Sequence, residues 1–281
     1  MKKQLNSAAI KALALDLDGT ALGLNAEFTG RTIGALRACI SRGIQVILCT
    51  GRAVEGAEKH RAAIGAEGPM VYFNGAEVVD MPEARVLSAG LMDLAVVDFC
   101  IDISRSMGVH YQVFFPAAAG SREILMIEKY SAEAEMYQKH TSIVPVIGDL
   151  KEAIAKPGLS GCIKGMFIAE SAVQDLIRPK LTARFGNSMY MAQTFPTFLE
   201  IMRAGVSKGE GLRFAMKQRG LKAEEVIALG NEENDLPMFN AVGFSVAPAN
   251  SRESVCAAAD LVIGSNEEEG VAAFLEEFLL N

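Results

Sequence analysis

The chain has 281 residues, 50% of them hydrophobic, which suffices for one large domain or two ordinary ones with a substantial core. Its formal net charge is −7 at pH 7 and its lysines and arginines form no long run, so we expect neither nucleic acid nor an anionic membrane surface as a partner. The five cysteines are scattered. With no secretory leader and no apolar run of roughly 20 residues, we expect a cytoplasmic protein.

Hydrophobic runs alternate with amphipathic stretches over the first 82 residues. Strands are predicted at 11–17 and 43–49, and helices at 29–42 and 53–64. This alternation is typical of parallel strands joined by helical crossovers. Two short strands, at 70–73 and 76–79, flank Asn74-Gly75, which is typical of a tight hairpin turn.

The pattern changes between residues 83 and 203. The predicted order is a helix at 91–107, strands at 109–115 and 122–128, a helix at 130–140, a strand at 162–169, a helix at 171–184, and strands at 188–194 and 198–203. Helices followed by pairs of strands indicate an α+β module. We expect its helices to cover one face of an antiparallel sheet.

The first pattern returns after residue 204. Helices are predicted at 208–219, at 235–240 and from 268 onward, and strands at 226–229, 244–246 and 261–263. The predicted fold class is therefore α/β, with a parallel sheet and an inserted α+β domain. The core is expected to be discontinuous, formed by residues 1–82 and 204–281, with residues 83–203 inserted between them.

Two carboxylates stand at the end of the first predicted strand, where Asp16 and Asp18 are followed by Gly19 and Thr20. Side chains alternate along a strand, so both aspartates are expected on one face. Two neighbouring acids repel each other, and burying either alone is costly, so this strand end is expected to hold a cation between them. Mg²⁺, which prefers oxygen ligands, suits such a site.

The motif Asp-Leu-Asp-Gly-Thr after a hydrophobic strand resembles the signature of the haloacid dehalogenase-like (HAD) superfamily, and the chain is similar to its Cof-type sugar-phosphatase branch. The resemblance implies a Rossmann-like HAD core and identifies residues 83–203 as a class IIB cap that selects the substrate. It also implies that Asp16 attacks phosphorus to form an aspartyl-phosphate, with Asp18 as general acid and base. Carboxylates are established nucleophiles of this kind.

Further segments extend the resemblance. Thr50 and Gly51 follow the second strand, where a hydroxyl and backbone amides suit phosphate oxygens, although Thr50 as a plain helix cap is an alternative. The resemblance assigns phosphate or substrate binding to Gly19, Thr50, Gly51, Asn74 and Asn234. For Asn74 the alternative is an ordinary hairpin turn.

Lys208 stands at the first turn of a predicted helix, where a cation is unfavourable for the helix dipole. In the family this lysine neutralises the transferred phosphoryl group, so the resemblance assigns Lys208 to catalysis. The alternative is a solvated surface lysine, the usual environment of this residue type.

The segment Gly230-Asn-Glu-Glu-Asn-Asp235 departs from the family, which has an aspartate, a Mg²⁺ ligand, in place of Asn231. An amide oxygen still coordinates hard cations but carries no charge. The predicted metal ligands are Asp16, Asp18, Asn231 and Asp235, with weaker magnesium binding than an aspartate would give.

The predicted function is a Mg²⁺-dependent phosphatase acting on a small phosphorylated metabolite, with a sugar phosphate as the favoured substrate. One alternative is a phosphomutase on the same core. Another is a weakly active or non-catalytic protein that binds a phosphorylated metabolite, because Asn231 replaces the acid. A monomer or homodimer is expected, and His60, His110 and His140 are assigned no catalytic role.

Overall fold

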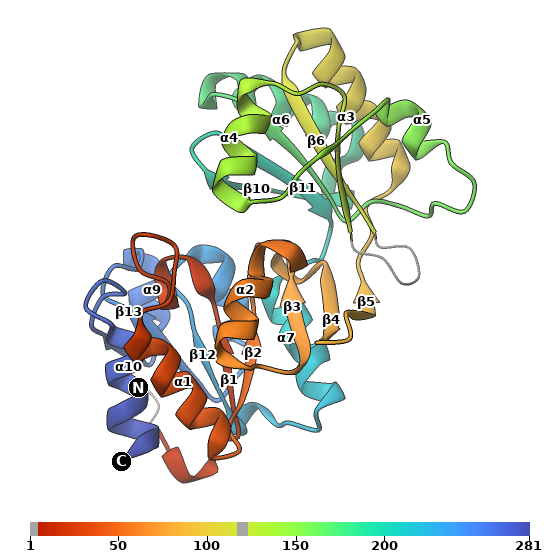
Figure 1. Cartoon of the computed structure of the whole chain (residues 1–281). Coiled ribbons are helices and arrows are strands. Elements are labelled where there is room, and N and C mark those ends of the chain that lie inside the picture. The colour runs from red at the N-terminus through yellow and green to blue at the C-terminus, as the bar shows by residue number, and fades with distance from the viewer. Residues whose placement is uncertain (1–4, 117–122) are drawn as a thin grey trace. The chain divides into compact units, whose positions relative to one another are not determined.

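The computed structural model describes residues 5–116 and 123–281 (Figure 1). The chain divides into two compact units. The first contains residues 5–52, 57–88 and 207–281, and the second contains residues 53–56 and 89–206. Within the ranges that the structure describes, every helix is too short or too polar to cross a membrane.

A parallel five-stranded sheet forms the centre of the first unit (Figure 1). Its strand order is β14-β13-β12-β1-β2. The strands are β1 (Ala12–Leu15), β2 (Gln45–Leu48), β12 (Val226–Leu229), β13 (Phe244–Pro248) and β14 (Leu261–Ile263). In register, Leu15 lies beside Leu48 of β2 and Leu229 of β12, so these three neighbouring strands end at the same edge. The predicted parallel sheet is confirmed.

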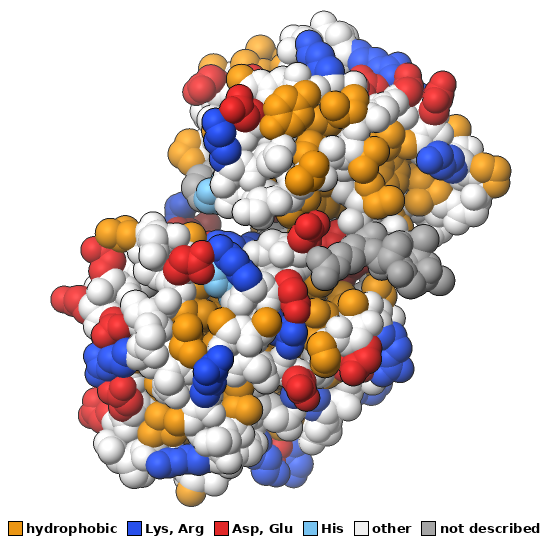
Figure 2. Space-filling model, in the orientation of Figure 1, with side chains coloured by type: hydrophobic (Ala, Val, Ile, Leu, Met, Phe, Trp, Pro, Cys, Tyr) orange, Lys and Arg blue, Asp and Glu red, His pale blue; other side chains and the backbone are white. Residues whose placement is uncertain are grey.

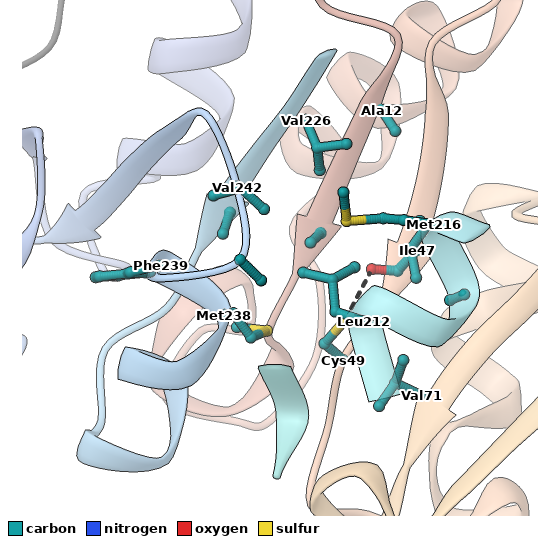
Figure 3. Close-up of a cluster of buried hydrophobic side chains, with 14 of the residues drawn as sticks. Ala12, Ile47, Cys49, Val71, Leu212, Met216, Val226, Met238, Phe239 and Val242 are labelled. Carbon is teal, nitrogen blue, oxygen red and sulfur yellow. Dashed lines mark hydrogen bonds between the residues drawn. The ribbon is translucent and has the colours of Figure 1, made fainter. Parts of the chain in front are cut away.

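Helices cover both faces of this sheet. They are α1 (Gly30–Ser41), α2 (Val54–Ile64), α7 (Lys208–Gln218), α8 (Leu236–Phe239), α9 (Glu253–Ala258) and α10 (Gly270–Leu275). Figure 3 shows one of the interfaces, where Leu212 and Met216 of α7 pack against Ile47 and Cys49 of the sheet. Because strand side chains alternate, the neighbouring sheet residues point to the opposite face, on the side where α1 packs against α10.

A small antiparallel sheet of β3 (Gly68–Tyr72), β4 (Glu77–Met81) and β5 (Arg85–Ala89) completes the first unit. The hairpin predicted around Asn74-Gly75 is present, but Tyr72 pairs with Glu77, so four residues connect the strands. This connection is therefore wider than the expected two-residue turn, and Phe73, Asn74 and Gly75 all have positive φ within it. The sequence pattern gave no signal for β5.

The second unit contains a six-stranded sheet in the order β10-β11-β9-β6-β7-β8. Its pairs are antiparallel except for β7 with β8. The strands are β6 (His110–Phe115), β7 (Ile124–Ile127), β8 (Val146–Ile147), β9 (Lys164–Ile168), β10 (Met189–Phe195) and β11 (Phe198–Arg203). The first residue of the strand predicted at 122–128, Arg122, lies outside the described residues.

The helices of the second unit are α3 (Leu94–Met107), α4 (Ala132–Thr141), α5 (Leu150–Ile154) and α6 (Ser171–Phe185). Residues of α3 and α6 share a hydrophobic cluster with one face of the sheet. The expectation that all helices cover one face is wrong for α4, because Tyr137 of α4 contacts Phe114 and Phe198, which point to the other face. Hydrophobic side chains are also exposed on the face of this unit that Figure 2 shows.

Candidate active site

Asp16 is the first residue after β1 and lies at the edge where β1, β2 and β12 end. Its backbone N–H donates to the carbonyl of Leu229, which continues the ladder beyond the strand. The Asp16 side chain is 5% exposed. Its Oδ1 accepts a hydrogen bond from Nζ of Lys208 at 2.6 Å, and its Oδ2 accepts one from the hydroxyl of Thr20 at 2.9 Å.

Lys208 begins α7, where Ser207 caps the helix by accepting from the N–H of Glu210. Its side chain is 2% exposed, so the interpretation of Lys208 as a surface lysine is wrong. The ammonium donates to Asp16 and, at 2.7 Å, to Oδ1 of Asp235. One buried cation therefore bridges two buried carboxylates.

Burial and neighbouring charges shift the pKa values of Asp16 and Lys208. Burial, reinforced by the carboxylate of Asp235 and opposed by Lys208, raises the pKa of Asp16 to about 7. Burial works against the charge of Lys208, but the carboxylates of Asp16 and Asp235 raise its pKa well above the ordinary lysine value. Lys208 is therefore a permanent positive charge at this strand edge.

Asp18 lies outside the strand, in a loop that turns at Gly19 with φ +74°. Its carboxylate accepts two hydrogen bonds from the guanidinium of Arg52, at 2.6 and 2.8 Å. The expectation that the two carboxylates share one strand face is therefore wrong, because β1 ends at Leu15 and the loop directs the Asp18 side chain to Arg52. A cation held by the two residues stays a prediction.

Arg52 also contacts Nε2 of His60, at 3.2 Å. Burial, followed by the positive charges of Arg52 and Lys59, lowers the pKa of His60 to about 4. His60 is therefore a neutral acceptor that supports the arginine at neutral pH. Sequence reasoning gave no role to Arg52 or His60, and only the position of Arg52 after Thr50-Gly51 could have signalled one.

Asn231 stands at the end of β12, and its side chain reaches the loop after β1. One of the two polar atoms of the Asn231 side-chain amide, its oxygen or its nitrogen, faces Thr20. This atom lies 3.0 Å from the main-chain O of Asp18 and 3.2 Å from Oδ2 of Asp16. Neighbouring ligands of octahedral Mg²⁺, at about 2.1 Å from the ion, stand about 3.0 Å apart. The carboxylate of Asp16, the carbonyl of Asp18 and the amide oxygen of Asn231 therefore fit a magnesium ion.

This donor set carries one formal negative charge, that of Asp16. Within the ranges 5–116 and 123–281, no three His, Cys, Asp or Glu side chains form a metal-binding group. Oδ2 of Asp235 accepts hydrogen bonds from the N–H groups of Asn231 and Glu232, at 2.8 and 3.0 Å. Asp235 thereby orients the Asn231 loop and Lys208, and its role as a direct metal ligand stays a prediction.

The predicted phosphate-binding residues form a second group at the same edge. The N–H of Asn74 donates to the carbonyl of Thr50, and Oδ1 of Asn74 accepts from Nδ2 of Asn234 at 3.0 Å. A Cβ at Gly51 would stand 3.0 Å from that Oδ1, so a larger residue would require the amide of Asn74 to shift. The Thr50 hydroxyl accepts from the N–H of Arg52, which caps the turn before α2.

Both groups are parts of one strand edge. Asp16, Lys208, Asn231 and Asp235 are joined by direct hydrogen bonds or by the Thr20 hydroxyl, which sequence reasoning left without a role. Gly19 lies beside Asn231, where a Cβ would stand 2.3 Å from the side-chain amide group. The structure thus brings the predicted site residues of the first unit together. It places the main-chain O of Asp18, and not its carboxylate, toward Asn231.

Comparisons with known proteins agree with this fold. A family model described as haloacid dehalogenase-like hydrolase matches residues 13–275. The chain is 28% identical over 269 residues to 5-amino-6-(5-phospho-D-ribitylamino)uracil phosphatase YitU of Bacillus subtilis (strain 168), with 95% of this chain and 96% of that protein covered.

Solved structures are similar over nearly the whole chain. The crystal structure of TM0651 from Thermotoga maritima has a TM-score of 0.83 and 29% identity, and covers 95% of this chain and 97% of its own. The HAD subclass IIB sugar phosphatase BT4131 has a TM-score of 0.76 and 21% identity, with coverage of 95% and 98%, which shows a shared fold. The chain belongs to the haloacid dehalogenase-like hydrolase family, as one of its phosphatases.

Proposed function

We propose that this protein is a Mg²⁺-dependent phosphatase that hydrolyses a small phosphorylated metabolite through an aspartyl-phosphate on Asp16. The observation that carries the proposal is the position of Asp16, buried at a strand edge near the ammonium of Lys208 and the side-chain amide of Asn231, which also faces the main-chain O of Asp18. Two of the similar proteins are named as phosphatases of small molecules, and one of them as a sugar phosphatase. A sugar phosphate is therefore the first substrate class to test.

Asp16 is the nucleophile in the first half of the reaction. Both oxygens of Asp16 accept hydrogen bonds, Oδ1 from Lys208 and Oδ2 from Thr20. The proposal assigns the attack on phosphorus to Oδ1, because Oδ2 also faces the amide of Asn231 on the side of the proposed metal. As the new bond from Oδ1 to phosphorus forms, the bond from phosphorus to the leaving oxygen breaks. Lys208, which already donates to Oδ1, offsets charge on the phosphoryl oxygens, and Thr50 and Asn234 orient them. When bound by Asp16, Asp18 and Asn231, Mg²⁺ supplies further positive charge to this group.

Asp18 transfers the protons. Its protonated carboxyl gives a proton to the leaving oxygen, and its carboxylate then takes one from the water that attacks the aspartyl-phosphate. The bond from phosphorus to Oδ1 breaks in that step, which releases inorganic phosphate and restores Asp16. Because Arg52 holds the Asp18 carboxylate in two hydrogen bonds, the proposal requires Asp18 to leave Arg52 when substrate binds. The inserted unit, residues 89–206, is assigned to selection of the leaving group.

The experiment measures phosphate release from a panel of sugar phosphates and an aryl phosphate, with Mg²⁺ varied to millimolar levels or removed by a chelator. Asp16→Asn is expected to lose about 10⁴-fold or more in rate, as removal of a nucleophile does. The matched control is Asp175→Asn, the same substitution at an exposed position of α6, which should leave the rate unchanged.

The intermediate is tested by trapping with hydroxylamine, which converts an aspartyl-phosphate into a hydroxamate that mass spectrometry locates on Asp16. Isomerised sugar phosphate without phosphate release would instead indicate a mutase. Folded protein that releases no phosphate from any substrate, at any Mg²⁺ concentration, would overturn the proposal in favour of a binding role.

A further inference from the structure

The backbone of Asn231 is held by a hydrogen bond to Asp235, and the side-chain amide of Asn231 contacts the loop after β1. The N–H of Asn231 and that of Glu232 donate to Oδ2 of Asp235, which holds the start of the loop. The residue is 8% exposed. Its amide therefore has a defined position but two possible orientations, because a half-turn about its last bond exchanges oxygen and nitrogen with little movement of other atoms.

The hydrogen bonds of Thr20 distinguish the two orientations. Its hydroxyl has one proton, and Oδ2 of Asp16 is an acceptor for it at 2.9 Å. If Asn231 presents its oxygen, that oxygen faces the carbonyl of Asp18 and Oδ2 of Asp16, which are both acceptors, and competes for the single Thr20 proton. Without a positive charge among them, these oxygens repel one another.

If Asn231 presents its nitrogen, the amide group faces acceptors. Nδ2 then lies 3.0 Å from the carbonyl of Asp18, 3.2 Å from Oδ2 of Asp16 and 3.0 Å from the oxygen of Thr20, three acceptors that share its two hydrogens. Thr20 keeps its proton for Asp16. The NH₂ group of Asn231 thus donates hydrogen bonds to the same oxygens that would bind a magnesium ion.

The geometry points to Asn231 as a magnesium-responsive amide, which donates through its nitrogen to Asp16 and Asp18 when no divalent cation is bound and turns to present its oxygen when Mg²⁺ binds. This inference rests on the magnesium dependence of the proposed function. An aspartate at this position has no hydrogen-bond donor, so it would stabilise only the protein with a bound cation. The asparagine therefore stabilises the cation-free protein and weakens magnesium binding.

The first test measures the affinity of the whole chain for Mg²⁺ alone by calorimetry, and its thermal unfolding with a chelator present. Asn231→Asp is expected to bind Mg²⁺ about tenfold or more tightly, because it adds a charge to the ligand set. In the chelator it is expected to unfold at a lower temperature than the wild type, because a carboxylate replaces a donor beside Asp16 and the carbonyl of Asp18. Asn240→Asp, at an exposed position, adds the same charge elsewhere and should change neither quantity.

Asn231→Ala separates a donating amide from one that always presents oxygen. Removing the donor takes a hydrogen bond from the main-chain O of Asp18 and from Oδ2 of Asp16, so the alanine variant should be less stable than the wild type in the chelator. Removing an oxygen that faces other oxygens would be neutral or stabilising. A wild type that is no more stable than Asn231→Ala and Asn231→Asp without metal would overturn the inference.

Nuclear magnetic resonance reads the amide directly. The side-chain NH₂ signals of Asn231, assigned by their loss in Asn231→Asp, should be protected from exchange with water in the chelator, and should shift and lose that protection as Mg²⁺ is added. Signals that stay unprotected throughout, or that Mg²⁺ leaves unchanged, would overturn the inference. These measurements use no substrate, so an inactive protein that shows the predicted amide response would refute only the proposed phosphatase activity.

Discussion

Replacement of Lys208 by methionine tests the charge bridge at the centre of the site. Methionine keeps much of the length and volume but removes the ammonium that donates to Asp16 at 2.6 Å and to Asp235 at 2.7 Å. Each hydrogen bond to a charged group contributes about 1.5–3 kcal/mol, so two give about 3–6 kcal/mol. The loss of one partner from a buried ion pair costs a similar amount, about 3–5 kcal/mol. We therefore expect the free energy of unfolding of the first unit to fall by about 3–5 kcal/mol.

The assay is urea unfolding at pH 8 with a chelator, followed by hydrogen exchange on peptides from β1 and α7 so that the first unit is read separately from the second. Lys217→Met is the matched control, since Lys217 lies exposed on the same helix and should change the free energy of unfolding by no more than about 0.5 kcal/mol. A loss within about 1 kcal/mol for Lys208→Met would refute the reasoning, because it would mean that Asp16 and Asp235 need no buried counter-charge.

Two further predictions concern a turn and a histidine. In Gly75→Ala the new Cβ would lie 2.0 Å from the carbonyl oxygen of Ser207, and residue 75 has a φ of +95°. We therefore expect the free energy of unfolding in urea to fall by more than about 2 kcal/mol. The control Gly34→Ala, in open space within α1, should raise it by roughly 0.5–1 kcal/mol. Equal effects of these two changes would contradict the close approach. Because the pKa of His60 is lowered to about 4 in the folded protein, the unfolded state binds more protons between pH 4 and 6.5. The free energy of unfolding of the wild type should therefore fall between pH 7 and pH 5 by about 2 kcal/mol more than that of His60→Gln. Glutamine keeps an acceptor for Arg52. Parallel pH profiles for the two proteins in urea unfolding would show that His60 takes up its proton as readily folded as unfolded.

Much of the site's location could be predicted from the sequence. Hydrophobic runs marked β1, β2 and β12, and their alternation with helices indicated that the strands are parallel. The carboxyl ends of parallel strands share one edge of a sheet. The predicted site residues Asp16, Thr50 and Asn231 stand at or just after the ends of those runs, and the structure places them at that edge.

The direction of each side chain at that edge was decided only by the tertiary structure. Strand periodicity predicted Asp16 and Asp18 on one face, but the strand ends before both, and the turn at Gly19 sends the Asp18 carboxylate to Arg52. Backbone dihedrals in a loop are set by its contacts, and no sequence period describes them.

Contacts between distant parts of the chain had no local signal at all. Lys208 and Asp16 are 192 residues apart, and Asn231 and Thr20 are 211 apart, so their pairing follows from how helices and strands pack. The sequence by itself determined which residues stand at the strand ends and that one expected acid is an amide. Only the folded chain decided that a buried lysine bridges two acids and that this amide faces the oxygens of Asp16 and Asp18, because burial and hydrogen-bond geometry arise from packing.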